Sequence, residues 1–151
     1  MKEIKAFFVM IFSAISAWFG VIAIPMFILI ALNITDYITG IVAGPYRGQQ
    51  ITSYKGLRGI AKKVCMWLLV AVGGVVDWLI MYAGDTIGID IKFKFVIACV
   101  VAIWLICNEL ISILENIKDI GTPLPTWLVK ITKNIKSQVE EKAESKEEIS
   151  E

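Results

Sequence analysis

Residues 64–83, VCMWLLVAVGGVVDWLIMYA, decide the class of fold. These 20 residues include one charge, Asp77, and a helix of that length extends about 30 Å, the thickness of the hydrocarbon core of a bilayer. Two further stretches have the same character, since residues 6–34 contain no charge and residues 95–114 contain only Glu109. We therefore expect an all-α protein whose hydrophobic helices cross a membrane several times.

The composition supports a membrane protein and argues against several chemistries. The 151-residue chain is 57% hydrophobic, with a mean hydropathy of +0.71, which leaves little sequence for a folded aqueous domain. It contains no histidine, the commonest general base and metal ligand. Its three cysteines, Cys65, Cys99 and Cys107, lie in apolar stretches without CxxC spacing, as buried structural cysteines do. We expect no enzymatic activity, no cofactor or metal, and no nucleic-acid partner.

Charges outside the apolar stretches predict the orientation, because Lys and Arg near span ends are retained in the cytoplasm. Residues 45–63 contain five basic and no acidic residues, so we expect a cytoplasmic loop there. The chain would then cross outward over 64–83 and return over about 95–115, which leaves the C-terminus in the cytoplasm. The basic residues should contact anionic lipid headgroups, at about 1 kcal/mol each. They are Arg47, Lys55, Arg58, Lys62 and Lys63.

Residues 6–44 allow two arrangements. They carry one charge, Asp36, and a single helix over them would be about 58 Å long, too long for one crossing. Two helices, about 6–22 and 25–44, could meet before Pro25, giving four hydrophobic helices and a cytoplasmic N-terminus. Alternatively, an interfacial helix precedes one crossing, giving three crossings and an outer N-terminus. We favour four helices, although the junction contains no polar turn residue.

The ionisable residue in the 64–83 stretch lies on a face of small residues. An ionisable group inside a bilayer costs several kcal/mol unless it is paired or hydrated, so it marks a functional site by default. Gly73 and Gly74 lie one helical turn before Asp77, and small residues let helices approach closely in lipid. This face predicts an oligomer seam or a pore wall. An intramolecular hydrogen bond from a protonated Asp77 is the alternative.

Two other polar faces surround Asp36 and Glu109. Gly40 shares the face of Asp36, and Ser112 shares the face of Glu109, which could also mark the inner headgroup region. Together the three faces predict a protein that associates within the membrane. The expected pore or oligomer interface comprises Asp36, Gly40, Gly73, Gly74, Asp77, Glu109 and Ser112.

The last part of the chain, residues 126–151, differs from the transmembrane domain of residues 1–125. Its apolar residues recur at helical spacing with lysines between them, which predicts an interfacial amphipathic helix on the inner leaflet. These apolar residues are Leu128, Ile131, Ile135 and Val139. An acidic tail follows, which we expect to be solvated.

Five segments together resemble the phage-lysis and toxin-secretion holin family of Gram-positive phages and clostridial toxin loci. They are DYITG (36–40), SYKGLRGIAKKV (53–64), VVD (75–77), NELISILENI (108–117) and GTPLP (121–125). The resemblance implies a homo-oligomer in the bacterial (host) cytoplasmic membrane. It also implies that the protein opens a lesion at a set time and so releases an endolysin or a toxin. It implies no catalytic residues.

Two other classes of function fit the same features. A small proton-coupled transporter could bind and release protons at one of the carboxylates, and it would work without loss of the membrane potential. A non-conducting antiholin-type subunit could bind a partner and delay lysis, and its expression alone should not kill. The holin is the main hypothesis.

Overall fold

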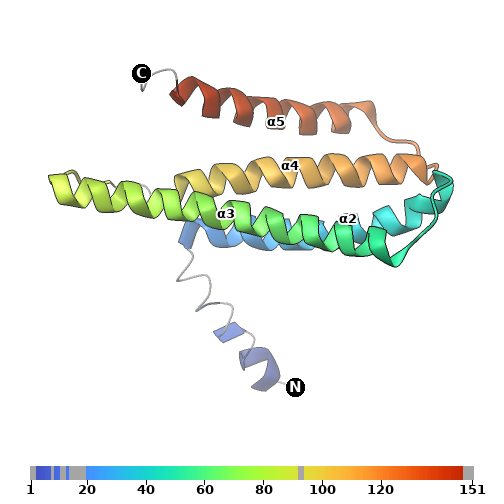
Figure 1. The fold of residues 1–151 in the computed structure, drawn as a ribbon, viewed down its shortest axis with the longest axis horizontal. Helices are drawn as coiled ribbons and strands as arrows, with labels where there is room; N and C mark the ends of the chain where they lie inside the picture. Colours follow the sequence, from blue (N-terminus) through green and yellow to red (C-terminus); the bar gives the residue numbers. More distant parts are fainter. Residues whose placement is uncertain (1–2, 8, 11–12, 14–19, 92–93, 148–151) are drawn as a thin grey trace.

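The computed structural model describes residues 3–7, 9–10, 13, 20–91 and 94–147. Every regular element in this part of the chain is a helix, which confirms the predicted all-α class (Figure 1). The elements are a 3-10 turn (Gly20–Ile22), α2 (Ala23–Tyr46), α3 (Ser53–Ile87), α4 (Val96–Asp119) and α5 (Thr126–Glu147).

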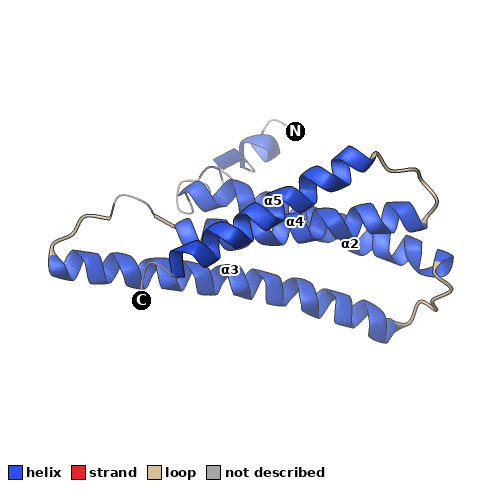
Figure 2. Cartoon of the chain, turned by 90° about the horizontal axis from the view of Figure 1, so that it is seen from above, coloured by secondary structure: helices blue, strands red, loops and turns tan. Residues whose placement is uncertain are grey.

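Three helical segments are long and apolar enough to cross a membrane, namely Gly20–Tyr46, Ser53–Ile87 and Val96–Asp119. They lie side by side, with α4 packed against both α2 and α3, whereas α2 and α3 touch each other only briefly (Figures 1 and 2). Many of their large apolar side chains face outward, among them Ile34 and Leu68. Such a surface is stable when lipid covers it, so the protein is a multi-pass membrane protein.

Small residues bring α3 and α4 into close contact. Ala98 and Ala102 of α4 are fully buried in the same core cluster as Val70 of α3. A Cβ atom added at Gly73 would lie 3.0 Å from the Ala98 Cα atom, so the approach of the two backbones requires glycine there. Leu29, also fully buried, joins α2 to this core.

The basic segment is largely helical, which corrects the expected loop over residues 45–63. α3 begins at Ser53, where the Thr52 hydroxyl oxygen accepts the backbone N–H of Lys55 at 3.3 Å and caps the helix. The connection between α2 and α3 is therefore reduced to residues 47–52. The lysines and arginine that follow project from a helix and not from a flexible loop.

Two glycines near the start of α3 pack against an aromatic side chain of α2. A Cβ atom at Gly56 would lie 3.2 Å from the Tyr37 hydroxyl oxygen, and one at Gly59 would lie 3.5 Å from the Tyr37 ring. Glycine weakens an isolated helix by about 1 kcal/mol relative to alanine. Here the tertiary contact with Tyr37 offsets that preference, which explains why a glycine-containing basic segment is helical.

The other expected helices coincide with parts of the observed ones. The expected helix 25–44 corresponds to α2, whose Pro25 lies in the first turn, where a missing N–H breaks no helical hydrogen bond. The expected helices 64–83 and 95–115 correspond to parts of α3 and α4. The expected first helix, 6–22, lies largely outside the described residues, as does the choice between four helices and three crossings.

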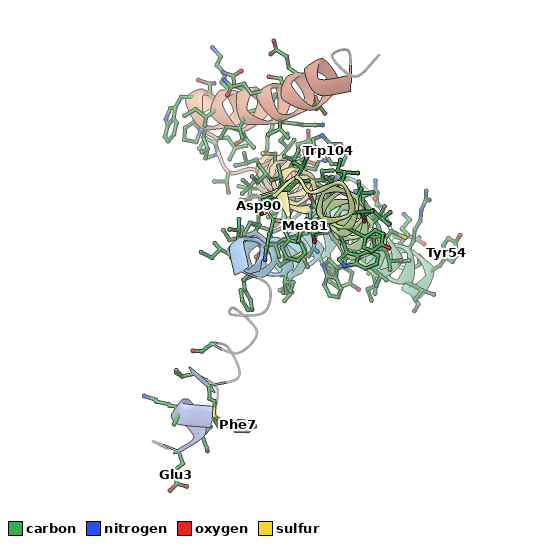
Figure 3. All side chains as sticks on the ribbon, turned by 90° about the vertical axis from the view of Figure 1, so that its left-hand side faces the viewer. Glu3, Phe7, Tyr54, Met81, Asp90 and Trp104 are labelled. Atoms are coloured by element: carbon green, nitrogen blue, oxygen red, sulfur yellow. The ribbon has the colours of Figure 1, made fainter. Side chains whose placement is uncertain are left out.

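α5 folds back along α4 and runs antiparallel to it (Figures 1 and 2). The Trp104 indole Nε1 donates to Glu140 Oε1 at 2.7 Å, and Lys136 Nζ lies 5.6 Å from the Trp104 ring centroid. Figure 3 shows Trp104 on the side of α4 that faces α5. An apolar stripe of α5 stays exposed and comprises Trp127, Ile131 and Ile135. The structure therefore differs from the expected position on the inner leaflet, because α5 packs along the α4 span.

Candidate functional site

Each of the three spanning helices contributes one charged side chain to a buried cluster. Lys63 of α3 donates from Nζ to Asp36 Oδ2 of α2 at 2.5 Å and also to Glu109 Oε2 of α4. The exposed fraction is 10% for the Lys63 side chain and 1% for that of Glu109. One ammonium group therefore links three helices through two carboxylates that are far apart in the sequence.

The cluster extends toward the turn at residues 47–52 through an asparagine. Asn116 Nδ2 donates to Asp36 Oδ1 at 3.1 Å and to Thr39 Oγ1 at 3.0 Å. Arg47 then donates from Nη2 to Asn116 Oδ1 at 2.6 Å and from Nε to Asp119 Oδ2 at 2.5 Å. The hydrogen bonds thus continue from the buried carboxylate to the partly exposed end of the bundle.

The cluster also extends toward the middle of the bundle, through the buried Asn33. In the amide orientation that satisfies both of its atoms, the Asn33 oxygen accepts Trp67 Nε1–H at 2.8 Å, and its nitrogen donates to Glu109 Oε2 at 3.0 Å. No buried side-chain nitrogen or oxygen in the described part of the chain lacks a hydrogen-bond partner. We call the connected set the charge network, and it comprises Asn33, Asp36, Thr39, Arg47, Lys63, Trp67, Glu109, Asn116 and Asp119.

Electrostatics make this network a strong constraint on how the helices are arranged. A carboxylate or ammonium group inside a bilayer is tolerated when it is paired and hydrogen-bonded, and removing one partner of a buried pair costs about 3–5 kcal/mol. Asp36, Lys63 and Glu109 come from three helices, so separating any helix from the others leaves a charge without its partner. The charges are compatible with the apolar spans only while the helices stay packed or while water replaces the partners.

Asp77 lies in the second half of α3 and caps α4. Its carboxylate accepts the backbone N–H groups of Ile97 at 3.0 Å and Ala98 at 2.8 Å. The residue at the N-cap position of α4, Phe95, has a left-handed backbone with φ 61° and forms no side-chain cap. Asp77 therefore supplies the missing acceptors from a neighbouring helix. The expected intramolecular hydrogen bonding of Asp77 is present, with the backbone N–H groups of α4 as donors.

The residues predicted from sequence fall into two separate groups. Asp36 and Glu109 belong to the charge network, and a Cβ atom at Gly40 would lie 3.7 Å from the Asn116 amide nitrogen. Ser112 is half-buried on α4, one turn beyond Glu109. The second group packs α3 against the start of α4, about 15–21 Å along α3 from Lys63. It comprises Gly73, Gly74 and Asp77.

The structure corrects the expected role of one basic residue. Lys63 was grouped with the lipid-contacting residues, but its ammonium group lies inside the bundle, between two carboxylates. A cation is stabilised there because the paired carboxylates replace its hydration shell. Of the other four basic residues, Lys55, Arg58 and Lys62 are exposed. Arg47 is exposed too, but its guanidinium is hydrogen-bonded to Asn116 and Asp119.

Sequence reasoning missed several members of the network. Asn33 and Asn116 were visible as polar residues on the faces of Asp36 and Glu109, and that signal could have identified them. Nothing in the sequence context of Trp67 indicates its hydrogen bond to a buried amide. Lys63 directly precedes the apolar stretch and lies four helical turns before Asp77, a spacing that places both residues on one face of α3.

The fold and the charge network define a small helical membrane protein with a buried polar centre shared by three spans. Residues 13–137 match the bacteriophage holin family. This match covers most of the chain, and the protein therefore belongs to that family.

Individual relatives are consistent with this assignment. An uncharacterised protein of Halalkalibacterium halodurans is 37% identical over 77% of this chain and 81% of its own length. An uncharacterised protein of Listeria monocytogenes is 33% identical over 85% of this chain and 84% of its own length. A protein of Bacillus phage phi105, named a probable holin, is 26% identical over 78% of each chain. No solved structure matches this fold significantly.

Proposed function

We propose that the protein is a holin that oligomerises in the bacterial cytoplasmic membrane and opens a lesion at a set time. An endolysin or a toxin would leave the cytoplasm through that lesion. Membership of the bacteriophage holin family and the similarity to a probable holin of a Bacillus phage support this role. The role needs neither catalysis nor a cofactor.

The observation that carries the proposed mechanism is the charge network. In the packed bundle, Lys63 is paired with Asp36 and Glu109, so the polar faces of the three spans are hidden from lipid. When helices of an assembly separate, the same side chains lose their partners and need water in place of them. If the subunits of an assembly turn these faces toward a common centre, the hydrated charged side chains would line a pore there.

This mechanism differs in one respect from the sequence-based expectation. The small and polar faces were expected to bury one another between subunits, whereas in this structure they bury one another within one chain. The Asp77 face packs against α4, and the Asp36 face packs against α3 and α4. We therefore propose that intramolecular contacts are exchanged for contacts with water and neighbouring subunits when the lesion forms.

The exposed basic residues support a proposed orientation in the membrane. Arg47, Lys55, Arg58 and Lys62 lie at the same end of the bundle, in the turn after α2 and the first turns of α3. Basic residues next to a span are retained on the cytoplasmic side. We propose that this end is cytoplasmic and that the exposed basic residues contact anionic headgroups. A cytoplasmic C-terminus, which we also propose, requires α5 to leave its position along α4, because in this structure α5 runs back toward the opposite end of the bundle.

Expression in a bacterial host tests the proposed function. Membrane potential and culture turbidity are followed after induction, with and without a co-expressed endolysin. A holin depolarises the membrane abruptly and lyses the culture only when the endolysin is present. A steady potential with continued growth contradicts the proposal and favours the transporter or the accessory subunit.

A further inference from the structure

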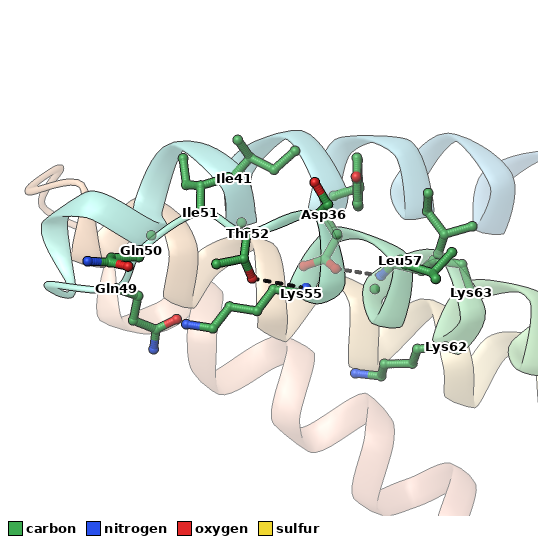
Figure 4. A pocket seen from close by; sticks show the side chains of 17 residues that line it. Asp36, Ile41, Gln49, Gln50, Ile51, Thr52, Lys55, Leu57, Lys62 and Lys63 are labelled. Carbon is green, nitrogen blue, oxygen red and sulfur yellow. Dashed lines mark hydrogen bonds and ion pairs between the residues drawn. The ribbon is translucent and has the colours of Figure 1, made fainter.

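A groove separates the C-terminal half of α2 from the start of α3. It has a volume of about 780 Å³, and residues from both helices and from the turn between them line it (Figure 4). Beside the groove, Tyr37 packs against Gly56 and Gly59 and Lys63 pairs with Asp36, and few other contacts join α2 and α3. Its size lies within the range of small-ligand sites, about 300–1,000 Å³.

The charges in the groove are unbalanced. Lys55 and Lys62 line it, both are exposed, and neither forms an ion pair within the described part of the chain. Figure 4 shows both side chains extending from the same side of α3. The one lining carboxylate, Asp36, is already occupied by Lys63 and Asn116. The groove therefore presents two free ammonium groups to a ligand and no free carboxylate.

Apolar side chains lie directly beside these lysines. They form one wall of the groove and are also exposed at the surface of the protein. The wall comprises Ile41, Ile51, Leu57 and Ile60, all of them exposed. A cationic rim next to an apolar wall that opens to the bilayer matches an amphiphile with an anionic head and a hydrocarbon tail.

We propose that this groove binds an anionic phospholipid of the leaflet that faces the turn at residues 47–52. The lipid phosphate lies between Lys55 and Lys62, and the start of an acyl chain lies against Ile60 and its apolar neighbours. This proposal goes beyond general attraction of basic residues to a charged membrane, because it assigns the contact to two lysines. Arg58, which is exposed in the same segment but does not line the groove, takes no part in it.

Lipid binding by the intact purified protein tests the proposal without reference to lysis. Binding of phosphatidylglycerol and of zwitterionic phosphatidylcholine is titrated in a neutral detergent by native mass spectrometry. The variant Lys55→Gln/Lys62→Gln is compared with Lys130→Gln/Lys133→Gln, which removes the same charge from exposed positions of α5 outside the groove. A third variant, Ile60→Trp, fills the groove without changing the charge, and circular dichroism verifies that all variants are helical.

The expected result is selective binding of phosphatidylglycerol. At about 1 kcal/mol per lysine, the groove variant should bind it about thirtyfold more weakly, whereas the control variant binds it within about twofold of the unchanged protein. Ile60→Trp should also weaken binding. An equal loss in both double variants shows nonspecific attraction and overturns the proposal, as does an unaffected Ile60→Trp. Equal binding of both lipids, or displacement of the lipid by inorganic phosphate at similar concentration, also overturns it.

Discussion

Replacement of Lys63 by methionine is the sharpest test of the charge network. Methionine keeps the length and the apolar stem of the side chain but removes the ammonium that serves Asp36 and Glu109. Removing one partner of a buried ion pair costs about 3–5 kcal/mol. Asn116 and Asn33 still donate to the two carboxylates, so we expect a loss near the lower end, about 3 kcal/mol. That is a large share of the free energy of unfolding of a typical domain, which is roughly 5–15 kcal/mol.

Two assays measure this loss. Thermal unfolding in detergent micelles, followed by circular dichroism, should show a clearly lower Tm for Lys63→Met than for Lys62→Met, whose ammonium is exposed on the same helix. In cells that co-express an endolysin, Lys63→Met should also lyse earlier, because the packed state is less stable. Protein level is measured in parallel, so that poor insertion is not mistaken for a change in timing.

A compensating variant makes the reasoning refutable. Lys63→Met combined with Asp36→Asn and Glu109→Gln removes all three charges but keeps the shapes of the side chains. Because no uncompensated charge remains, this variant should recover most of the lost Tm. The charge network does not stabilise the packed bundle if Lys63→Met is no less stable than Lys62→Met. The same conclusion follows if the triple variant is less stable than Lys63→Met.

Three further predictions follow from the packing contacts, and each is measured as the shift in Tm against its control. Asp77→Ala removes both acceptors from the start of α4 and should cost about 1–2 kcal/mol, whereas Asp77→Asn keeps one acceptor oxygen and should cost less. Gly73→Ala places a Cβ atom 3.0 Å from a backbone atom of α4 and should lower the stability by about 1–3 kcal/mol. In the control Gly74→Ala the Cβ atom would lie 4.0 Å from the nearest atom of the Phe95 ring, so no loss of stability is expected. Glu140→Ala removes the acceptor of the Trp104 N–H, which joins α5 to α4. Limited proteolysis should therefore cleave α5 faster in Glu140→Ala than in the control Lys133→Ala. Equal cleavage in both variants would contradict the role of that contact.

Local properties of the chain explain what could be predicted without a structure. Apolar stretches of about 20 residues locate helices that can span a bilayer, because the bilayer thickness and the helical rise are constants. An ionisable group in lipid is costly in any fold, so Asp36, Asp77 and Glu109 could be identified from the sequence as residues that need partners. The boundaries were less accurate, since the helical start of α3 depends on the packing of Tyr37 against Gly56 and Gly59.

The amino-acid sequence by itself therefore determined the class of protein, the spans and the carboxylates that need partners. Only the tertiary structure decided which groups pair with these carboxylates. Lys63 lies 27 residues from Asp36 and 46 from Glu109, and Asp77 lies 20 and 21 residues before the N–H groups it accepts. Helical periodicity shows which face of a helix is polar or small. It does not show which residue of another helix that face meets, because this depends on where the helices cross and how far each is shifted along its neighbour.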